Sequence, residues 1–220
     1  MCIRDSATTG LGHSNIDGSE KNIYNALNGS KTVSEIIQNT QIDNLDIITS
    51  NVDLSGLEVE TADDNGRAFI LRDKLSLFFK ENMSNYSHVF IDCPPSLGLI
   101  TINALTSSDS VIIPIQCEYY ALEGLGKLLN TIKGVQKVHN EKLEIEGILL
   151  TMFDSRLRLS NQVKNDVKKH FGNMVFSTII PRNVSLGEAP SYGESIIVYN
   201  STSKGSKSYI KFAQEVINLN

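Results

Sequence analysis

The sequence predicts an α/β fold built on a mainly parallel sheet with helices on both faces, and three observations support this prediction. The chain has 220 residues and a mass of 24.3 kDa, which suits one α/β domain. Strand-like apolar runs alternate with segments of helical period, the pattern of stacked βαβ units. Residues 111–113 and 148–150 are continuously apolar, as expected of strands that helices cover on both sides.

The strands and helices follow from this alternation. Apolar runs predict strands at residues 45–49, 88–92, 110–115, 145–152, 174–180 and 195–199. Helical spacing predicts helices at residues 66–80, 99–105, 121–139, 160–171 and 204–219.

Two of the helices carry additional signals. In 121–139, apolar residues recur at spacings of three and four, at Leu122, Leu125, Leu128, Leu129, Ile132, Val135 and Val138. Ser160 is expected to cap the N-terminus of the helix at 160–171, because its hydroxyl can accept a hydrogen bond from the first turn. Lys168, Lys169 and His170 fall in the last turn of that helix, where cations interact favourably with the helix dipole.

The composition is that of an ordinary globular protein, with 40% apolar and 20% charged residues and a mean hydropathy of −0.12. No apolar run approaches the ~20 residues of a membrane span, and no charged-then-apolar leader is visible, so a cytoplasmic location is expected. The three cysteines, Cys2, Cys93 and Cys117, indicate neither a disulfide framework nor a zinc site. Cys93 and Cys117 are expected to be small buried residues beside strands.

Charge is unevenly distributed along the chain. The formal net charge is −5, yet residues 127–170 hold nine basic and five acidic side chains. Such a stretch can contact a polyanion, because phosphate attraction depends on the local field. Taken alone, these charges are better explained by a solvated helix face.

A carboxylate follows the predicted strand in the segment YSHVFIDCPPSL, residues 86–97. Asp92 stands at the strand's carboxyl end, and Pro94 and Pro95 stop the strand. Ligands of open α/β sheets bind at such ends, and a carboxylate there can hold Mg²⁺ beside nucleotide phosphates. The alternative is an aspartate that caps the following turn.

Three long motifs give the sequence a specific resemblance. Residues 86–105 (YSHVFIDCPPSLGLITINAL), 111–129 (VIIPIQCEYYALEGLGKLL) and 147–200 (GILLTMFDSR … IPRNVSLGEAPSYGESIIVYN) resemble the ParA/Soj chromosome- and plasmid-partitioning ATPases. These proteins form part of the deviant Walker P-loop group, which also includes MinD. The resemblance runs from Ala7 to the C-terminus, with the motifs in the family's order and spacing.

The resemblance implies a P-loop NTPase-like fold and a nucleotide-dependent cycle. Family members bind Mg·ATP, form homodimers around two nucleotides, bind DNA without sequence preference, and are stimulated to hydrolyse ATP by a ParB/Spo0J-type partner. Asp92 matches the Walker B carboxylate, which acts near Mg²⁺ and is expected to hold it through water. The residues that match the adenine-binding segments are Met152, Asp154, Pro181, Arg182 and Asn183.

The same resemblance implies a DNA-binding surface and, with it, association with the nucleoid. Arg156 aligns with an arginine that serves non-specific DNA binding, and the nearby basic residues are Arg158, Lys164, Lys168 and Lys169. The family usually has a second basic residue directly after IPRNV, where this chain has Ser185. We therefore expect weaker DNA binding than in a typical member.

The front of the chain departs from the family pattern. No G-x-x-x-x-G-K-[ST] phosphate loop and no D-x-D-P-Q segment occurs, and residues 7–12 match the family segment that lies just after D-x-D-P-Q. We interpret residues 1–6 as a foreign start, and 7–220 as a single ParA-like, AAA-type domain that lacks the first strand, the phosphate loop and the second strand. Strands such as 89–91 would then lack hydrogen-bonding neighbours, and the chain as written would be inactive.

Two other functions remain open at this point. A non-catalytic dimerisation or interaction module, or the product of a decayed gene, would need no phosphate loop. A MinD-like membrane-cycling ATPase would need a basic amphipathic C-terminal helix. The tail 209–220 carries Lys211 alone as a basic residue, so membrane binding is not expected.

Overall fold

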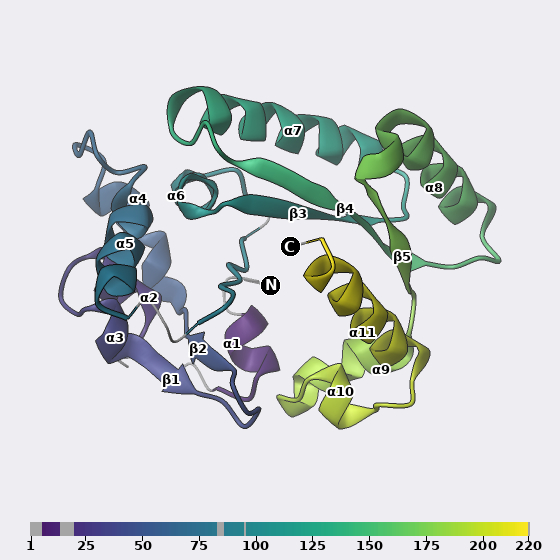
Figure 1. Ribbon diagram of the computed structural model, residues 1–220, viewed down its shortest axis with the longest axis horizontal. Coiled ribbons are helices and arrows are strands. Elements are labelled where there is room, and N and C mark those ends of the chain that lie inside the picture. The colour runs from purple at the N-terminus through teal and green to yellow at the C-terminus, as the bar shows by residue number, and fades with distance from the viewer. Residues whose placement is uncertain (1–5, 14–19, 83–85, 95, 220) are drawn as a thin grey trace. The chain divides into compact units, whose positions relative to one another are not determined.

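The computed structural model describes residues 6–13, 20–82, 86–94 and 96–219, which group into two compact units (Figure 1). One unit comprises Met1–Ser108 with Val135–Glu141, and the other Asp109–Gly134 with Lys142–Asn220. The start that we interpret as foreign lies outside the described residues except for Ser6. A single domain over 7–220 stays a prediction.

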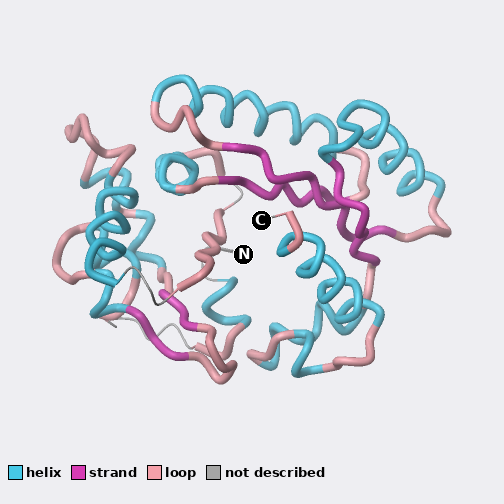
Figure 2. Tube along the Cα trace, in the orientation of Figure 1, coloured by secondary structure: helices cyan, strands magenta, loops and turns pink. Residues whose placement is uncertain are grey.

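The second unit contains a three-stranded parallel sheet. Its strands are β3 (Ser110–Gln116), β4 (Glu144–Phe153) and β5 (Val175–Pro181), in the order β3-β4-β5 (Figure 2). The register pairs Ile113 with Ile148 and Ile115 with Leu150. All three strands were predicted, and they confirm the parallel character of the sheet.

Helices cover both faces of this sheet because apolar side chains point alternately to each face. Leu149, Phe176 and Ile180 form one core cluster with Val216 of α11 (Lys204–Ile217). Ile148 and Leu150 point to the opposite face and are also fully buried. Figure 1 shows α7 (Ala121–Val138) and α8 (Arg158–Phe171) on that side of the sheet. These three helices confirm the predicted segments.

A carboxylate from α11 binds backbone donors of β5 where the pairing of β4 and β5 is irregular. Glu215 accepts hydrogen bonds from the backbone N–H groups of Ser177 (2.6 Å) and Thr178 (3.0 Å). Burial raises the pKa of Glu215, but the hydrogen bonds from Thr178 and Ser177 together outweigh it, so the net shift is downward. The contact satisfies two strand donors that would otherwise need water or another strand.

Two local predictions in this unit are wrong. Residues 195–199 do not form a strand: α10 (Ile196–Tyr199) is a helical turn in which Ser195 Oγ accepts the Val198 N–H. Helix α8 begins at Arg158 rather than at Ser160. Ser160 is buried, and its hydroxyl donates to the Cys117 carbonyl (3.2 Å), so it joins α8 to the end of β3 instead of capping the helix.

Short elements complete the second unit between these strands and helices. They are η2 (Gly172–Met174) before β5, and α9 (Val184–Glu188) and η3 (Ala189–Tyr192) after it. Gly193, with φ 66°, ends η3 in the left-handed region that glycine adopts without strain.

The first unit is mainly helical with a two-stranded antiparallel sheet. β1 (Ile37–Asn39) pairs with β2 (Asp46–Ile48), so the predicted strand at 45–49 exists but lies outside the parallel sheet. β1 was not expected. The helices of this unit are α1 (Ser6–Gly10), α2 (Ile23–Leu27), α3 (Val33–Ile36), η1 (Val52–Ser55), α4 (Leu57–Glu60), α5 (Ile70–Asn82) and α6 (Leu99–Ser107).

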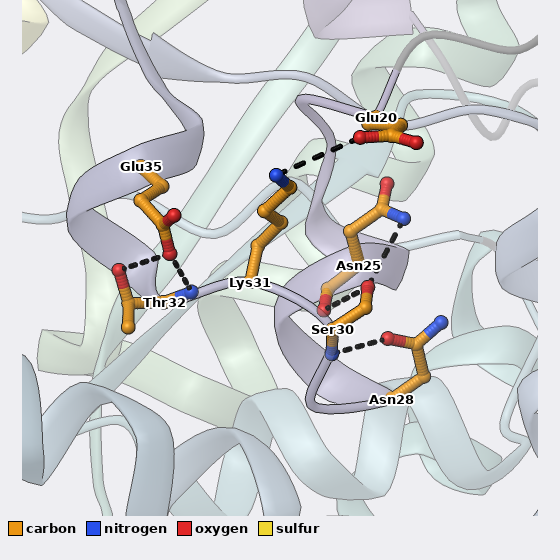
Figure 3. Close-up of polar contacts among 7 residues, drawn as sticks. All are labelled: Glu20, Asn25, Asn28, Ser30, Lys31, Thr32 and Glu35. Carbon is orange, nitrogen blue, oxygen red and sulfur yellow. Dashed lines mark hydrogen bonds and ion pairs between the residues drawn. The ribbon is translucent and has the colours of Figure 1, made fainter.

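Polar contacts fix the link from α2 to α3 (Figure 3). Glu35 accepts hydrogen bonds from the backbone N–H (2.7 Å) and the hydroxyl (2.8 Å) of Thr32, which starts α3. The Asn28 side chain accepts the Ser30 N–H at 2.9 Å. These contacts hold α3 so that Val33 and Ile36 pack into the core of the unit with Ala26 and Phe78.

The strand predicted at 88–92 is not formed. Residues 86–94 lie in no strand, and Val89 and Phe90 are 52% and 77% exposed. An apolar segment forms a strand only when a neighbour pairs with it, and no described segment does so. The segment borders a cavity of about 410 Å³ lined mainly by apolar side chains. Cys93, expected to be buried here, is exposed.

A test of the sheet packing uses two glycines with opposite surroundings. A Cβ at Gly147 in β4 would come within 2.6 Å of the Phe176 ring, whereas one at Gly134 in α7 would meet nothing within 4 Å. We expect Gly147→Ala to lower the free energy of unfolding by ~1–3 kcal/mol. Gly134→Ala is expected to raise it by ~0.5–1 kcal/mol, because alanine restricts the unfolded chain and favours the helix. Urea unfolding followed by circular dichroism measures both changes, and equal effects would contradict the packing.

Candidate functional site

The carboxyl ends of the three parallel strands open onto one cavity in the second unit. The cavity has a volume of about 630 Å³. Its walls come from the end of β3, the first turns of α7, Met152, which is the second-last residue of β4, and Arg182, which directly follows β5. Parallel strands bring their carboxyl ends to the same edge, which is where ligands of open α/β sheets bind.

The rim of this cavity carries an aromatic pair and an ion pair. Tyr119 and Tyr120 are 73% and 75% exposed, with ring centroids 5.1 Å apart in an edge-to-face arrangement. Glu118 Oε1 lies 3.3 Å from the guanidinium of Arg182. Sequence reasoning did not name these three lining residues, although their position directly after a predicted strand was a usable signal.

Met152 and Arg182, which the resemblance assigns to adenine binding, are brought together here. Met152 has φ 54°, a left-handed conformation that is uncommon for a residue other than glycine. The Arg182 N–H donates to the carbonyl of Phe153 at 2.9 Å, and Phe153 pairs with Pro181. Local strain in a strand end that lines a cavity is typical of binding sites.

Asn183 continues the same segment as the residue before α9. In the described part of the chain its side-chain Oδ1 is buried and has no hydrogen-bond partner. A buried acceptor without a donor is unusual in proteins. Asn183 does not line the cavity, however, and its Oδ1 is directed at α11, where a Cβ on Gly205 would come within 3.1 Å of it.

Asp154 and Arg156 form a bidentate ion pair in the loop after β4. Arg156 donates from Nε to Asp154 Oδ1 (2.9 Å) and from NH2 to Oδ2 (2.7 Å), and its backbone N–H also donates to Oδ1 (3.0 Å). These hydrogen bonds lower the pKa of the Asp154 carboxyl to about 2. The resemblance gave these residues separate roles, yet the structure joins them.

The basic residues near this loop lie on α8. Lys164 places its ammonium 5.1 Å from the centre of the Phe153 ring, which brings the helix close to the end of β4. Ser160, Val163 and Val167 form the buried face of α8. The remaining cations of the predicted DNA-binding set that are exposed on this helix are Arg158, Lys168 and Lys169.

Asp92 belongs to the first unit, within the segment 86–94, which forms no strand, so the prediction that Asp92 stands at the carboxyl end of a strand is wrong. Loss of surrounding water raises the pKa of its carboxyl, and a hydrogen bond from the Ala7 backbone opposes that rise. A carboxylate suits Mg²⁺, which prefers oxygen ligands and retains waters. Among the described residues no group of three His, Cys, Asp or Glu side chains is arranged to hold a metal ion.

Comparison with known proteins identifies the family. Residues 4–145 match the AAA domain family. The sporulation initiation inhibitor protein Soj of Bacillus subtilis is 49% identical over 211 residues, covering 96% of this chain and 81% of Soj. The chromosome partitioning protein ParA of Myxococcus xanthus is 46% identical, covering 99% of this chain and 75% of that protein. This chain belongs to the Soj/ParA family of partitioning ATPases.

A solved structure agrees with the fold expected of a Soj/ParA protein. The chain is similar to cobyrinic acid a,c-diamide synthase from Mycobacterium smegmatis with bound ADP and magnesium. The identity is 32%, the TM-score is 0.78, and the match covers 94% of this chain and 75% of the other. The P-loop NTPase-like α/β fold predicted from the sequence is thus confirmed. In the described residues, no helix has the length and apolar character needed to cross a bilayer.

The ion pair of the Asp154 loop can be tested by titration. Asp154 should titrate near the pKa of about 2 that its hydrogen bonds from Arg156 impose. In Arg156→Gln the midpoint should rise toward the ordinary range near 3.9. Because the folded pKa lies below the unfolded value, the pair stabilises the fold above the unfolded pKa, and this contribution is lost as pH falls toward 2.

Carbon-13 NMR of the Asp154 carboxyl measures both midpoints. Identical Asp154 midpoints in the two proteins would show that the pair is absent in solution.

Proposed function

We propose that this chain carries the base-binding and DNA-binding parts of an ATP-dependent partitioning switch. The observation that supports this most directly is the arrangement at the strand ends of the second unit. Met152, near the end of β4, and Arg182 line the cavity. Directly after β4, the chain continues through Asp154 and Arg156 into the basic helix α8. Nucleotide contacts and phosphate-backbone contacts can therefore be made from neighbouring positions.

ATP with Mg²⁺ is the proposed cofactor. The similar solved synthase binds ADP and magnesium. Of the residues that the resemblance assigns to the base, Met152 and Arg182 line the cavity. Pro181 would add an apolar wall, and Asp154 and Asn183 would add polar groups, from positions that adjoin the cavity. Asp92 would hold Mg²⁺ through water, and the bound ion would neutralise phosphate charge. Residues 1–220 contain no glycine-rich phosphate loop, so we expect no ATP hydrolysis by this chain alone.

Non-specific DNA is the proposed polyanionic partner. Arg156, Arg158, Lys164 and Lys168 would contact phosphates rather than bases. Within the family cycle, ATP would drive homodimerisation, and a ParB/Spo0J-type protein would stimulate hydrolysis and release the DNA. The chain would act in the cytoplasm at the nucleoid, without membrane binding. Ser185, in place of the usual basic residue, would reduce the number of phosphate contacts.

DNA binding is tested by fluorescence anisotropy with random-sequence duplexes across a range of salt concentrations. Arg156→Glu should weaken binding at least tenfold at low salt, because it replaces an attraction to phosphate with a repulsion. Losing one phosphate contact should also reduce the slope of log affinity against log salt by ~0.9. Arg67→Glu changes the same charge at an exposed position of the first unit and serves as the matched control. Equal losses in both variants would favour general electrostatics over a DNA-binding site.

The role of Asp92 is tested in a chain extended before Ala7 by the phosphate-loop segment of Soj. This chimera should hydrolyse ATP in the presence of Mg²⁺, and Asp92→Ala should lower turnover by ~100-fold or more, because metal-assisted charge stabilisation is lost. Asp53→Ala, an exposed acidic residue of the same unit, is the control. Unchanged turnover in Asp92→Ala would remove this residue from the metal site.

A further inference from the structure

We propose that Asp154 is a positioning residue for DNA binding, which holds the Arg156 guanidinium so that its unused edge faces a phosphodiester. This inference rests on the proposed DNA-binding function and adds a residue that the resemblance had assigned to the nucleotide base. It follows from how the two side chains share their hydrogen-bonding groups.

The donors of Arg156 divide into two sets. A guanidinium has five N–H donors in a fixed planar fork. Asp154 accepts from Nε and from one side of NH2, at 2.9 and 2.7 Å. Both donors of NH1 and the second donor of NH2 are directed away from the carboxylate. This second edge has the geometry that binds a phosphate through two parallel hydrogen bonds.

Burial differs sharply between the two partners. The Asp154 side chain is 13% exposed, whereas the Arg156 side chain is 86% exposed. The carboxylate is therefore an anchor within the fold, and the guanidinium it holds lies in solvent, where DNA can reach it. A salt bridge between two mobile surface side chains would give no such orientation.

The anchor itself is fixed by the end of the sheet. Asp154 follows Phe153, whose carbonyl accepts the Arg182 N–H at 2.9 Å. Asp154 Oδ1 also accepts the Arg156 backbone N–H at 3.0 Å, so the turn and the side-chain pair support one another. Arg182, the other arginine near this carboxylate, is engaged by Glu118 at 3.3 Å. Arg182 therefore does not compete with Arg156 for the Asp154 carboxylate.

Orientation and repulsion act in opposite directions on DNA affinity. Holding a long side chain in its bound geometry removes an ordering cost at binding, whereas the Asp154 charge repels the phosphate. The guanidinium stands between the two anions, and the phosphate would bind in solvent, where salt and water weaken repulsion at that separation. Orientation should therefore be the larger effect.

The experiment measures DNA binding by the wild-type chain, Asp154→Asn, Arg156→Ala and the double variant. Asparagine keeps an oxygen that can accept the Arg156 backbone N–H, so the turn is retained while the charged pair is lost. We expect Asp154→Asn to weaken binding about two- to tenfold, with an undiminished salt slope because the phosphate contact still forms. Arg156→Ala should weaken binding and lower the slope by ~0.9. Adding Asp154→Asn to Arg156→Ala should have no further effect.

Asp166→Asn is the matched control. It also removes one negative charge, here from a residue of α8, and leaves the Asp154–Arg156 pair in place. Simple electrostatics predicts equal or tighter binding for both asparagine variants. If Asp154→Asn binds DNA as well as or better than the wild type, the positioning role is wrong even though the DNA-binding proposal stands. If the wild type binds no DNA at low salt, the proposed function fails, and this inference fails with it.

A second readout does not depend on DNA. Nitrogen-15 NMR should show the Arg156 Nε–H protected from solvent exchange in the free wild-type chain, and exposed in Asp154→Asn. Thermal unfolding of each variant verifies that it is folded. Equal exchange rates in the wild type and Asp154→Asn would show that Asp154 does not hold Arg156, which would overturn the inference by itself.

Discussion

The constraint on which the candidate site depends is the parallel pairing of β3, β4 and β5. Parallel strands all end at the same edge, so Gln116 pairs with Thr151 and Phe153 with Pro181 although these residues lie far apart in the sequence. These ends position Met152 and Arg182 at the cavity, and residues of α7 and the start of α8 complete its lining. The apolar faces buried beneath α7, α8 and α11 hold the strands in register, and the register in turn fixes where the polar groups appear.

The end of β4 and the loop after it combine two kinds of chemistry in five residues, 152–156. Met152, in a left-handed conformation, lines the cavity. Two residues later, Asp154 accepts hydrogen bonds from Arg156. A rigid strand end therefore supports both an apolar wall and a charged pair. Any ligand that shifts the position of Met152 acts on the same short segment that carries Arg156.

The sequence was sufficient where burial alone decides structure, and insufficient where a partner or a turn decides it. Residues 111–113 and 148–150 are continuously apolar, a pattern that strands covered on both faces accommodate. Residues 88–92 contain a similar apolar run, but no described strand pairs with them. The β-branched run at 196–198 favours a strand, yet the Ser195 cap stabilises a helical turn. Within the site, the resemblance brought Met152 and Arg182 together, while the Asp154–Arg156 pair depends on turn geometry that neither composition nor periodicity reveals.

The carboxylate of Glu215 lies where the pairing of β4 and β5 is irregular. Ile148 pairs with Val175 and Leu150 with Ile179, so β5 has two more residues than β4 between these pairs. Within that stretch, the backbone N–H groups of Ser177 and Thr178 donate to Glu215 of α11. A helix side chain therefore supplies acceptors at a point where the strand pairing is interrupted, and a substitution at position 215 would disturb the sheet as well as the helix.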